Sequence, residues 1–303
     1  MATITSTHPT RPVQPPPGRI YRFFHSGRGD SPFRRLWINA LLILACVIAI
    51  YPVLRVFSVS LRPNNQLFSP SLSIIPDNAT LDNYTRLFTE KNFLVWIWNS
   101  IIITIVVATI GVALAATSAY AFSRWKFRMR SAGLVFLLTT QMIPAAMLLI
   151  PIYLLLARLQ MTNTYTGMVL AYIVSSIPFS VWILKGYYDT IPVDLEEAAM
   201  IDGASRLGTF TRMVLPLSTP ALAIVFLFNF MQSWQEFPVA YRIVTNETLW
   251  TWPLGIKAMQ GQFQTEWGMY AAGSVLIMLP VVLLFLYSAK WLVSGLTLGS
   301  VKG

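Results

Sequence analysis

The densest group of ionisable side chains in the sequence lies between residues 192 and 220, which read PVDLEEAAMIDGASRLGTFTRMVLPLSTP. Together with the acid just upstream, this stretch holds five of the twelve acidic residues: Asp189, Asp194, Glu196, Glu197 and Asp202. Two helix-forming pieces meet at Asp202-Gly203, where glycine permits a sharp bend. On the second piece, Leu207, Phe210 and Val214 have the spacing of one apolar helix face. Acidic groups beside an apolar face predict a surface that docks a partner protein.

Local signals predict where both helices begin and end. Asp194 is the expected N-cap of the first helix, and Asp202 or Ser205 that of the second, because a side-chain oxygen there accepts an unpaired backbone N–H. Pro216 and Pro220 are expected to end the second helix and to begin the next apolar segment.

The sequence lacks the residue sets that common enzymes use. It contains no G-x-x-x-x-G-K-[ST] phosphate-binding loop, so ATP hydrolysis by that route is not expected. The two histidines, His8 and His25, lie in the polar N-terminal arm, and Cys46 is the only cysteine. We therefore expect no catalytic residue, metal site or cofactor in this chain.

The composition is that of an integral membrane protein. Apolar residues make up 55% of the chain and charged residues 11%, whereas soluble proteins have about 25% charged residues. The net charge of +10 does not indicate nucleic acid, because the basic residues cluster at the ends of apolar runs.

Six apolar runs are long enough to cross a bilayer. They are residues 36–57, 95–122, 132–157, 167–184, 220–241 and 269–292. An all-α integral membrane fold with six transmembrane helices is therefore expected. Pro144 and Pro151 are expected to interrupt the third run, and Pro178 to kink the fourth.

The segments between these runs define the domain organisation and the orientation. They are an N-terminal arm (1–35), a loop on the opposite side of the membrane (58–94), a five-helix core (95–292) with loops 185–218 and 242–268, and a C-terminal tail (293–303). Of the 22 Lys and Arg residues, 15 lie on the side of the two termini. Because cytoplasmic loops are enriched in Lys and Arg, both termini and the 185–218 loop are expected in the cytoplasm.

The docking stretch resembles the EAA loop of permeases of binding-protein-dependent ABC importers. The matching residues are Glu197-Ala198-Ala199, Gly203, Met213 and Leu215-Pro216, with Met213 where the family usually has Ile. Further similarity, which includes Gln141-Met-Ile-Pro144, extends over most of the chain and is closest to the smaller maltose/maltodextrin permease subunits.

This resemblance implies a type I ABC importer permease in the bacterial inner membrane. The implied partners are a second, homologous permease subunit, two ATPase subunits that bind ATP and Mg, an extracytoplasmic sugar-binding protein and membrane lipid. The implied cargo is maltose, maltodextrin or a related oligosaccharide, with another sugar or a polyol as the alternative. The residues expected to couple the chain to the ATPase are Glu196, Glu197, Ala198, Ala199, Asp202, Gly203, Phe210, Leu215 and Pro216.

Polar residues within the apolar runs are candidates for the translocation path. Asn229, Gln232 and Glu236 have i, i+3, i+7 spacing on the fifth helix, and Gln141 lies in the third run. Asn229, Gln232 and Gln141 have amides that can bind sugar hydroxyls. The alternative is that they hold neighbouring helices together.

The outer loop at 260–264 is rich in amides. By its position in the resembling subunits, it is expected to face the binding protein through Gln260, Gly261, Gln262, Phe263 and Gln264. A plain solvated loop is the alternative.

Two other protein classes fit the sequence less well. An ion-coupled secondary carrier needs charged residues at mid-membrane depth, but Arg55 and Glu236 are near the ends of their runs. A structural membrane scaffold would leave the EAA sequence unexplained.

Overall fold

The computed structural model describes residues 31–63, 65, 67, 73–261 and 265–299, with the side chains only up to residue 291 at the C-terminal end. The described part is helical, and its only β pairing is an isolated bridge between Gln260 and Thr265. This confirms the all-α expectation. The chain divides into two compact units, residues 1–55 and 56–303.

The first long helix, α2 (Pro32–Ser60), runs through the boundary between these units. Its 29 residues include one internal proline, Pro52, and its most apolar window has a mean hydropathy of 2.5. At 1.5 Å per residue, α2 is about 43 Å long, which exceeds a hydrocarbon core of about 30 Å.

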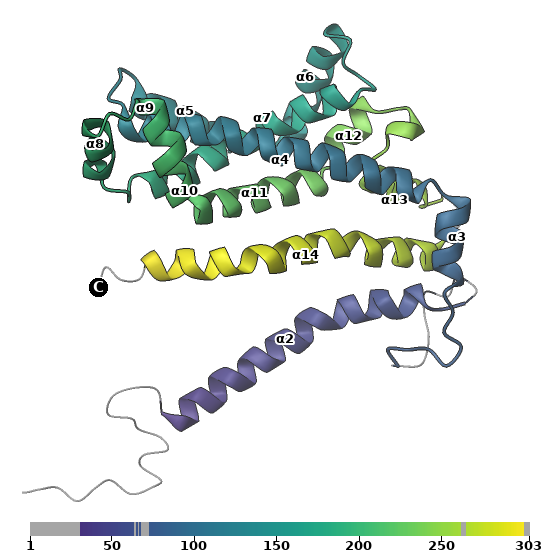
Figure 1. Ribbon diagram of the computed structural model, residues 1–303. Coiled ribbons are helices and arrows are strands. Elements are labelled where there is room, and N and C mark those ends of the chain that lie inside the picture. Colours follow the sequence, from purple (N-terminus) through teal and green to yellow (C-terminus); the bar gives the residue numbers. More distant parts are fainter. Residues whose placement is uncertain (1–30, 64, 66, 68–72, 262–264, 300–303) are drawn as a thin grey trace, which may run out of the picture. The chain divides into compact units, whose positions relative to one another are not determined.

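Three further helices form the centre of the second unit: α4 (Phe93–Arg124), α7 (Tyr165–Tyr188) and α11 (Thr219–Trp234). Helix α4 packs along both α7 and α11, and α14 (Trp267–Gly299) packs against α11 (Figure 1). The close approach depends on small residues of α4. A Cβ atom added to Gly111 would lie 3.1 Å from the Asn229 amide and 3.2 Å from the Ser176 hydroxyl.

Two membrane segments are bent pairs of helices. In the first, α5 (Arg130–Thr140) and α6 (Ala145–Arg158) meet at 100°. The break precedes Pro144, as expected, but Pro151 lies inside α6, so the second predicted interruption is wrong. In the second pair, residues Arg206–Leu217 meet α11 at 77°.

Four helices of the described chain are long and apolar enough to cross a membrane individually, and counting each bent pair as one span gives six. The predicted fifth run, however, ends early. Helix α11 stops at Trp234, and the Glu236 carboxylate instead accepts the Val239 N–H at the start of α12 (Pro238–Ile243), at 2.8 Å. Glu236 therefore does not lie on a polar face of the fifth helix, contrary to the sequence-based expectation.

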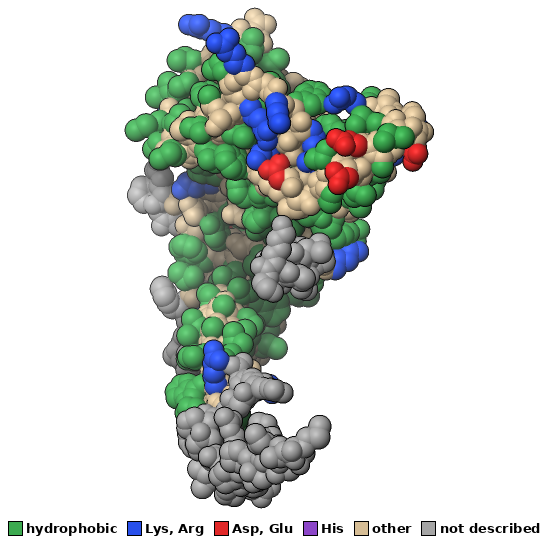
Figure 2. All heavy atoms as spheres, turned by 90° about the vertical axis from the view of Figure 1, so that its left-hand side faces the viewer, with side chains coloured by type: hydrophobic (Ala, Val, Ile, Leu, Met, Phe, Trp, Pro, Cys, Tyr) green, Lys and Arg blue, Asp and Glu red, His purple; other side chains and the backbone are tan. Residues whose placement is uncertain are grey.

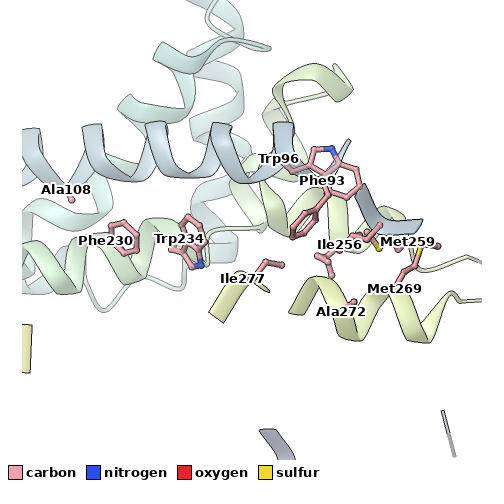
Figure 3. Packing of buried hydrophobic residues seen from close by; sticks show 11 residues of the cluster. Phe93, Trp96, Ala108, Phe230, Trp234, Ile256, Met259, Met269, Ala272 and Ile277 are labelled. Atoms are coloured by element: carbon pink, nitrogen blue, oxygen red, sulfur yellow. The ribbon is translucent and has the colours of Figure 1, made fainter. Parts of the chain in front are cut away.

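Short helices that the sequence did not predict cover the end of the bundle at which α4 begins. They are α3 (Asp82–Glu90) and α13 (Trp252–Ala258), and a 3-10 turn at Glu247–Leu249 precedes α13. Figure 3 shows aromatic side chains of α4 and α11 in one cluster with apolar side chains of α13 and α14. The side chain of Asn99 in α4 donates to Thr248 O and Trp250 O, both at 2.9 Å. The segment before α13 is thus attached directly to α4.

Candidate functional site

The predicted docking stretch forms two helices at one end of the second unit (Figure 1). The first, α8 (Val193–Ile201), begins after Pro192, which occupies the N-cap position. Asp194 lies inside the first turn, so its prediction as the N-cap is wrong. Asp194 and Glu196 nevertheless lie near the helix N-terminus, where the helix dipole favours negative charge.

Gly203 forms the bend between the two helices. Its φ of +91° lies in the region that favours glycine. Gly203 N–H donates to Met200 O at 3.1 Å, and Ala204 N–H to Ala199 O at 2.9 Å, the pair of bonds that closes a helix in a Schellman motif. The Ser205 hydroxyl then accepts the Gly208 N–H at 3.1 Å and caps the second helix. The predicted bend at Gly203 and the Ser205 cap are confirmed.

The second helix is irregular along its length. It comprises α9 (Arg206–Thr209), a π-helical segment (Phe210–Val214) and α10 (Leu215–Leu217). Leu215 N–H bonds to Phe210 O, five residues earlier. Pro216 follows and has no N–H to donate. Widened turns of this kind are frequent at functional sites.

The predicted single apolar face of this helix is divided. Phe210 and Val214 are buried, whereas the Leu207 side chain is 72% exposed. On α8, Ile201 is 86% exposed. Figure 2 shows Asp and Glu side chains gathered on this face beside a group of Lys and Arg. Ile201 and Leu207 are the most exposed of the large apolar side chains on α8 and α9, and they lie among charged side chains.

Glu196 does not belong to that exposed surface. It is 3% exposed, and its Oε1 lies 2.6 Å from Nε of Arg124, the last residue of α4. Its Oε2 accepts the Tyr120 hydroxyl at 2.7 Å, and Arg124 also donates to Ile191 O at 3.0 Å. The prediction that Glu196 is one of the exposed acids of the docking surface is wrong, because Arg124 and Tyr120 of α4 bind its carboxylate in the interior of the chain.

The nine predicted coupling residues therefore occupy three environments. Glu197, Ala198, Asp202, Gly203 and Pro216 are exposed, Ala199 and Leu215 are half-buried, and Glu196 and Phe210 are buried. The Phe210 ring packs on the Tyr120 ring with centroids 4.6 Å apart. Tyr120 and Arg124 stand more than 70 positions before Glu196, so no local pattern in the sequence predicts their contact with it.

A second ionic contact fastens the chain just before α8. The Asp189 carboxylate accepts from the Lys185 ammonium at 2.6 Å and from the Ser123 hydroxyl at 2.7 Å. Burial opposes the charged form, but these two donors outweigh it and hold the pKa of Asp189 below its usual value.

The structure brings two of the three path candidates together. Gln141 lies at the break between α5 and α6, and its amide donates to Ser175 O at 3.2 Å. The Gln232 amide lies 3.4 Å from the Ser175 hydroxyl. Gln141 and Gln232 are both exposed. Ser175 completes this polar group, and its identity as a serine in an apolar run was the only sequence signal.

Asn229 occupies a different environment. It is fully buried, its Oδ1 accepts the Ser180 hydroxyl at 2.9 Å, and its Nδ2 lies against Gly111. Among the described residues, Nδ2 has no hydrogen-bond partner. The geometry favours a role in holding α11 to α7 and α4 for this residue.

Asn65 anchors the segment that follows the amide-rich loop at 260–264. Asn65 donates through Nδ2 to Thr265 O at 2.8 Å and accepts the Gly268 N–H at 3.0 Å. Gln260 and Gly261 are exposed, while Gln262, Phe263 and Gln264 lie outside the described residues. As for a metal site, the described residues contain no group of three or more His, Cys, Asp or Glu side chains.

Comparisons with known proteins agree with this architecture. Residues 109–297 match the family described as binding-protein-dependent transport system inner membrane component. The maltose/maltodextrin transport system permease protein MalG of Escherichia coli K12 is 37% identical, with 89% of this chain and 96% of that protein covered. The diacetylchitobiose uptake system permease protein DasC of Streptomyces coelicolor is 30% identical, with 90% and 99% covered.

A solved structure has the same fold. A bacterial ABC transporter involved in the import of the acidic polysaccharide alginate contains a chain that is 22% identical, with a TM-score of 0.74 and coverage of 91% of this chain and 99% of that one. Helical architecture, bent membrane segments and sequence similarity thus lead to one assignment. The chain belongs to the inner membrane components of binding-protein-dependent transport systems, the permeases of ABC importers.

Proposed function

We propose that this permease imports maltose, maltodextrin or a related oligosaccharide as one of two permease chains driven by two ATPase subunits. The observation that carries the coupling part of this proposal is the exposed surface of α8 and α9, where Ile201 and Leu207 project beside Glu197 and Asp202. The cargo is inferred from similarity to maltose/maltodextrin and diacetylchitobiose permeases.

The docking surface has the features of a protein interface. Complete burial of one Ile or Leu side chain is worth about 1.5–3 kcal/mol, and Ile201 and Leu207 leave most of that gain available to a partner. The exposed acids supply charge complementarity to a basic partner surface. We assign ATP and Mg binding to the ATPase subunits, because this chain has no phosphate-binding loop.

We place this surface in the cytoplasm, with both termini on the same side. The exposed Lys126 and Arg128 lie in the loop that follows α4, and α4 ends at the Arg124–Glu196 contact. Basic residues beside the docking surface agree with the positive-inside rule. The loop at 260–264, which Asn65 anchors at Thr265 and Gly268, would then face the extracytoplasmic binding protein.

Gln141, Gln232 and Ser175 are our candidates for sugar contacts. Exposed amide and hydroxyl groups within membrane segments are costly against lipid, whereas a polar path or a partner chain would satisfy them. Each glutamine retains an amide oxygen that can accept a sugar hydroxyl.

Co-purification with the neighbouring subunits in detergent tests the coupling assignment. We expect Glu197→Lys and Gly203→Asp to lose the ATPase while the permease pair survives. Glu247→Lys, a charge reversal at an exposed residue of the outer loops, is the matched control and should retain it. An ATPase that stays bound and coupled in both docking variants would contradict the assignment. A ligand screen of the binding protein identifies the sugar.

A further inference from the structure

The cytoplasmic end of α4 carries a buried group that the docking role does not use. Arg124 and Glu196 are 9% and 5% exposed at their side chains and form an ion pair at 2.6 Å. Arg124 lies in the last turn of α4 and Glu196 in the first turn of α8, so each charge also has the sign that the nearby helix end favours. The contact is charged, directional and shielded from water.

Tyr120 links the Arg124–Glu196 pair to the helix that follows the bend at Gly203. Its hydroxyl donates to Glu196 in α8, while its ring lies against Phe210 in the π-helical segment. The two helices that meet at Gly203 therefore both rest on residues of one turn of α4. Movement of either helix would act on α4 directly.

Glu196 and Glu197 face different surroundings although they are neighbours. Successive residues on an α-helix point about 100° apart, and here Glu196 is buried against α4 while Glu197 is exposed. One carboxylate is available to a partner, and the other is committed to this chain.

We propose that Tyr120, Arg124 and Glu196 form the joint through which the coupling segment moves α4. Glu196 is thus a positioning residue, distinct from the docking residue Glu197, and this inference rests on the proposed coupling function. Helix α4 is continuous for 32 residues and reaches the outer loops, where Asn99 holds Thr248 and Trp250. The route through Pro216, by contrast, crosses a π-helical segment and a 77° bend.

The test separates docking from transmission in the complete transporter. In proteoliposomes with sugar-loaded binding protein, ATP hydrolysis and sugar uptake are measured together, and ATPase retention is measured during purification. We expect Glu196→Gln to retain the ATPase but to raise the ATP consumed per sugar about tenfold, within the range of about 5- to 150-fold that typical coupling energies represent. Glu197→Lys should lose the ATPase instead.

Charge reversal provides the second arm. Arg124→Glu and Glu196→Arg should each uncouple transport, and the double variant should recover part of the coupling because the pair is rebuilt with opposite polarity. Glu247→Gln is the control for neutralising an acid far from the joint. If Glu196→Gln does not accumulate in the membrane, Tyr120→Phe decides, because it removes only the hydroxyl that binds Glu196.

The outcomes distinguish this inference from the function on which it rests. Loss of the ATPase in Glu196→Gln, unchanged ATP per sugar in Glu196→Gln or Tyr120→Phe, or a double reversal no better than its parents would overturn the joint. Failure of the unmodified chain to retain any ATPase would instead overturn the proposed function itself.

Discussion

Replacing Gly203 with alanine isolates the backbone contribution of the bend between α8 and α9. A Cβ atom added there meets no atom within 4 Å, so steric overlap with neighbours does not contribute. The φ of +91° remains unfavourable for an L-residue, and left-handed backbone costs about 1–2 kcal/mol outside glycine. The free permease can relieve that strain by opening the bend, and docking of the ATPase must then restore it. The same energy is lost from binding, so the affinity of the permease for the ATPase should fall about 5- to 30-fold, at about 1.4 kcal/mol per tenfold.

The assay is titration of purified ATPase onto the permease pair for Gly203, Gly203→Asn and Gly203→Ala. Asparagine tolerates positive φ better than alanine, so affinity should fall in the order Gly, Asn, Ala. Gly186→Ala is the matched control, since Gly186 also has open space at the Cβ position but lies within helix α7 without positive φ. Equal affinities for Gly203 and Gly203→Ala, or weaker binding by the asparagine variant than by alanine, would refute the strain argument.

Four further variants test other parts of the structure. Gly255→Ala should destabilise the purified chain by about 1–3 kcal/mol, seen as a lower melting temperature than in Gly186→Ala, because its Cβ would overlap the Trp96 ring. Burial opposes the charged form of Asp189, but its donors hold the pKa below the usual value, so its contribution to stability is present above about pH 4 and is lost as the pH falls through the folded-state pKa. Asp189→Asn should therefore flatten the stability profile below about pH 4, and an unchanged profile would contradict this. Gln141→Ala with Gln232→Ala should reduce sugar uptake while ATPase retention stays normal, whereas Asn229→Ala should lower thermal stability; uptake unaffected by the glutamine pair would remove it from the path.

The sequence was informative where the signal is local. Gly203 between two helix-forming pieces predicted the hinge, and Ser205 predicted the cap, because backbone angle and capping depend on few neighbours. The long apolar runs predicted the membrane helices for the same reason. The break before Pro144 was equally readable.

Features that depend on distant residues were not predictable. Which of two adjacent glutamates faces inward depends on Tyr120 and Arg124, which are far away in sequence. The short helices α3 and α13 lie in segments that looked like polar loops, and packing onto α4 and α14 gives them their place. Glu236 resembled part of a helix face by spacing alone, but its carboxylate caps the next helix.

The length of α4 lowers the cost of burying the charged pair at its end. Its 32 residues extend for about 48 Å, well beyond a hydrocarbon core of about 30 Å. The terminal arginine can therefore lie at the level of the headgroups, where burial is provided by protein and not by acyl chains. An ion pair there avoids the cost of charge in lipid while remaining dry enough to be rigid. Helix α4 is thus long enough to span the hydrocarbon core without a break and to keep its Arg124–Glu196 ion pair outside the acyl chains.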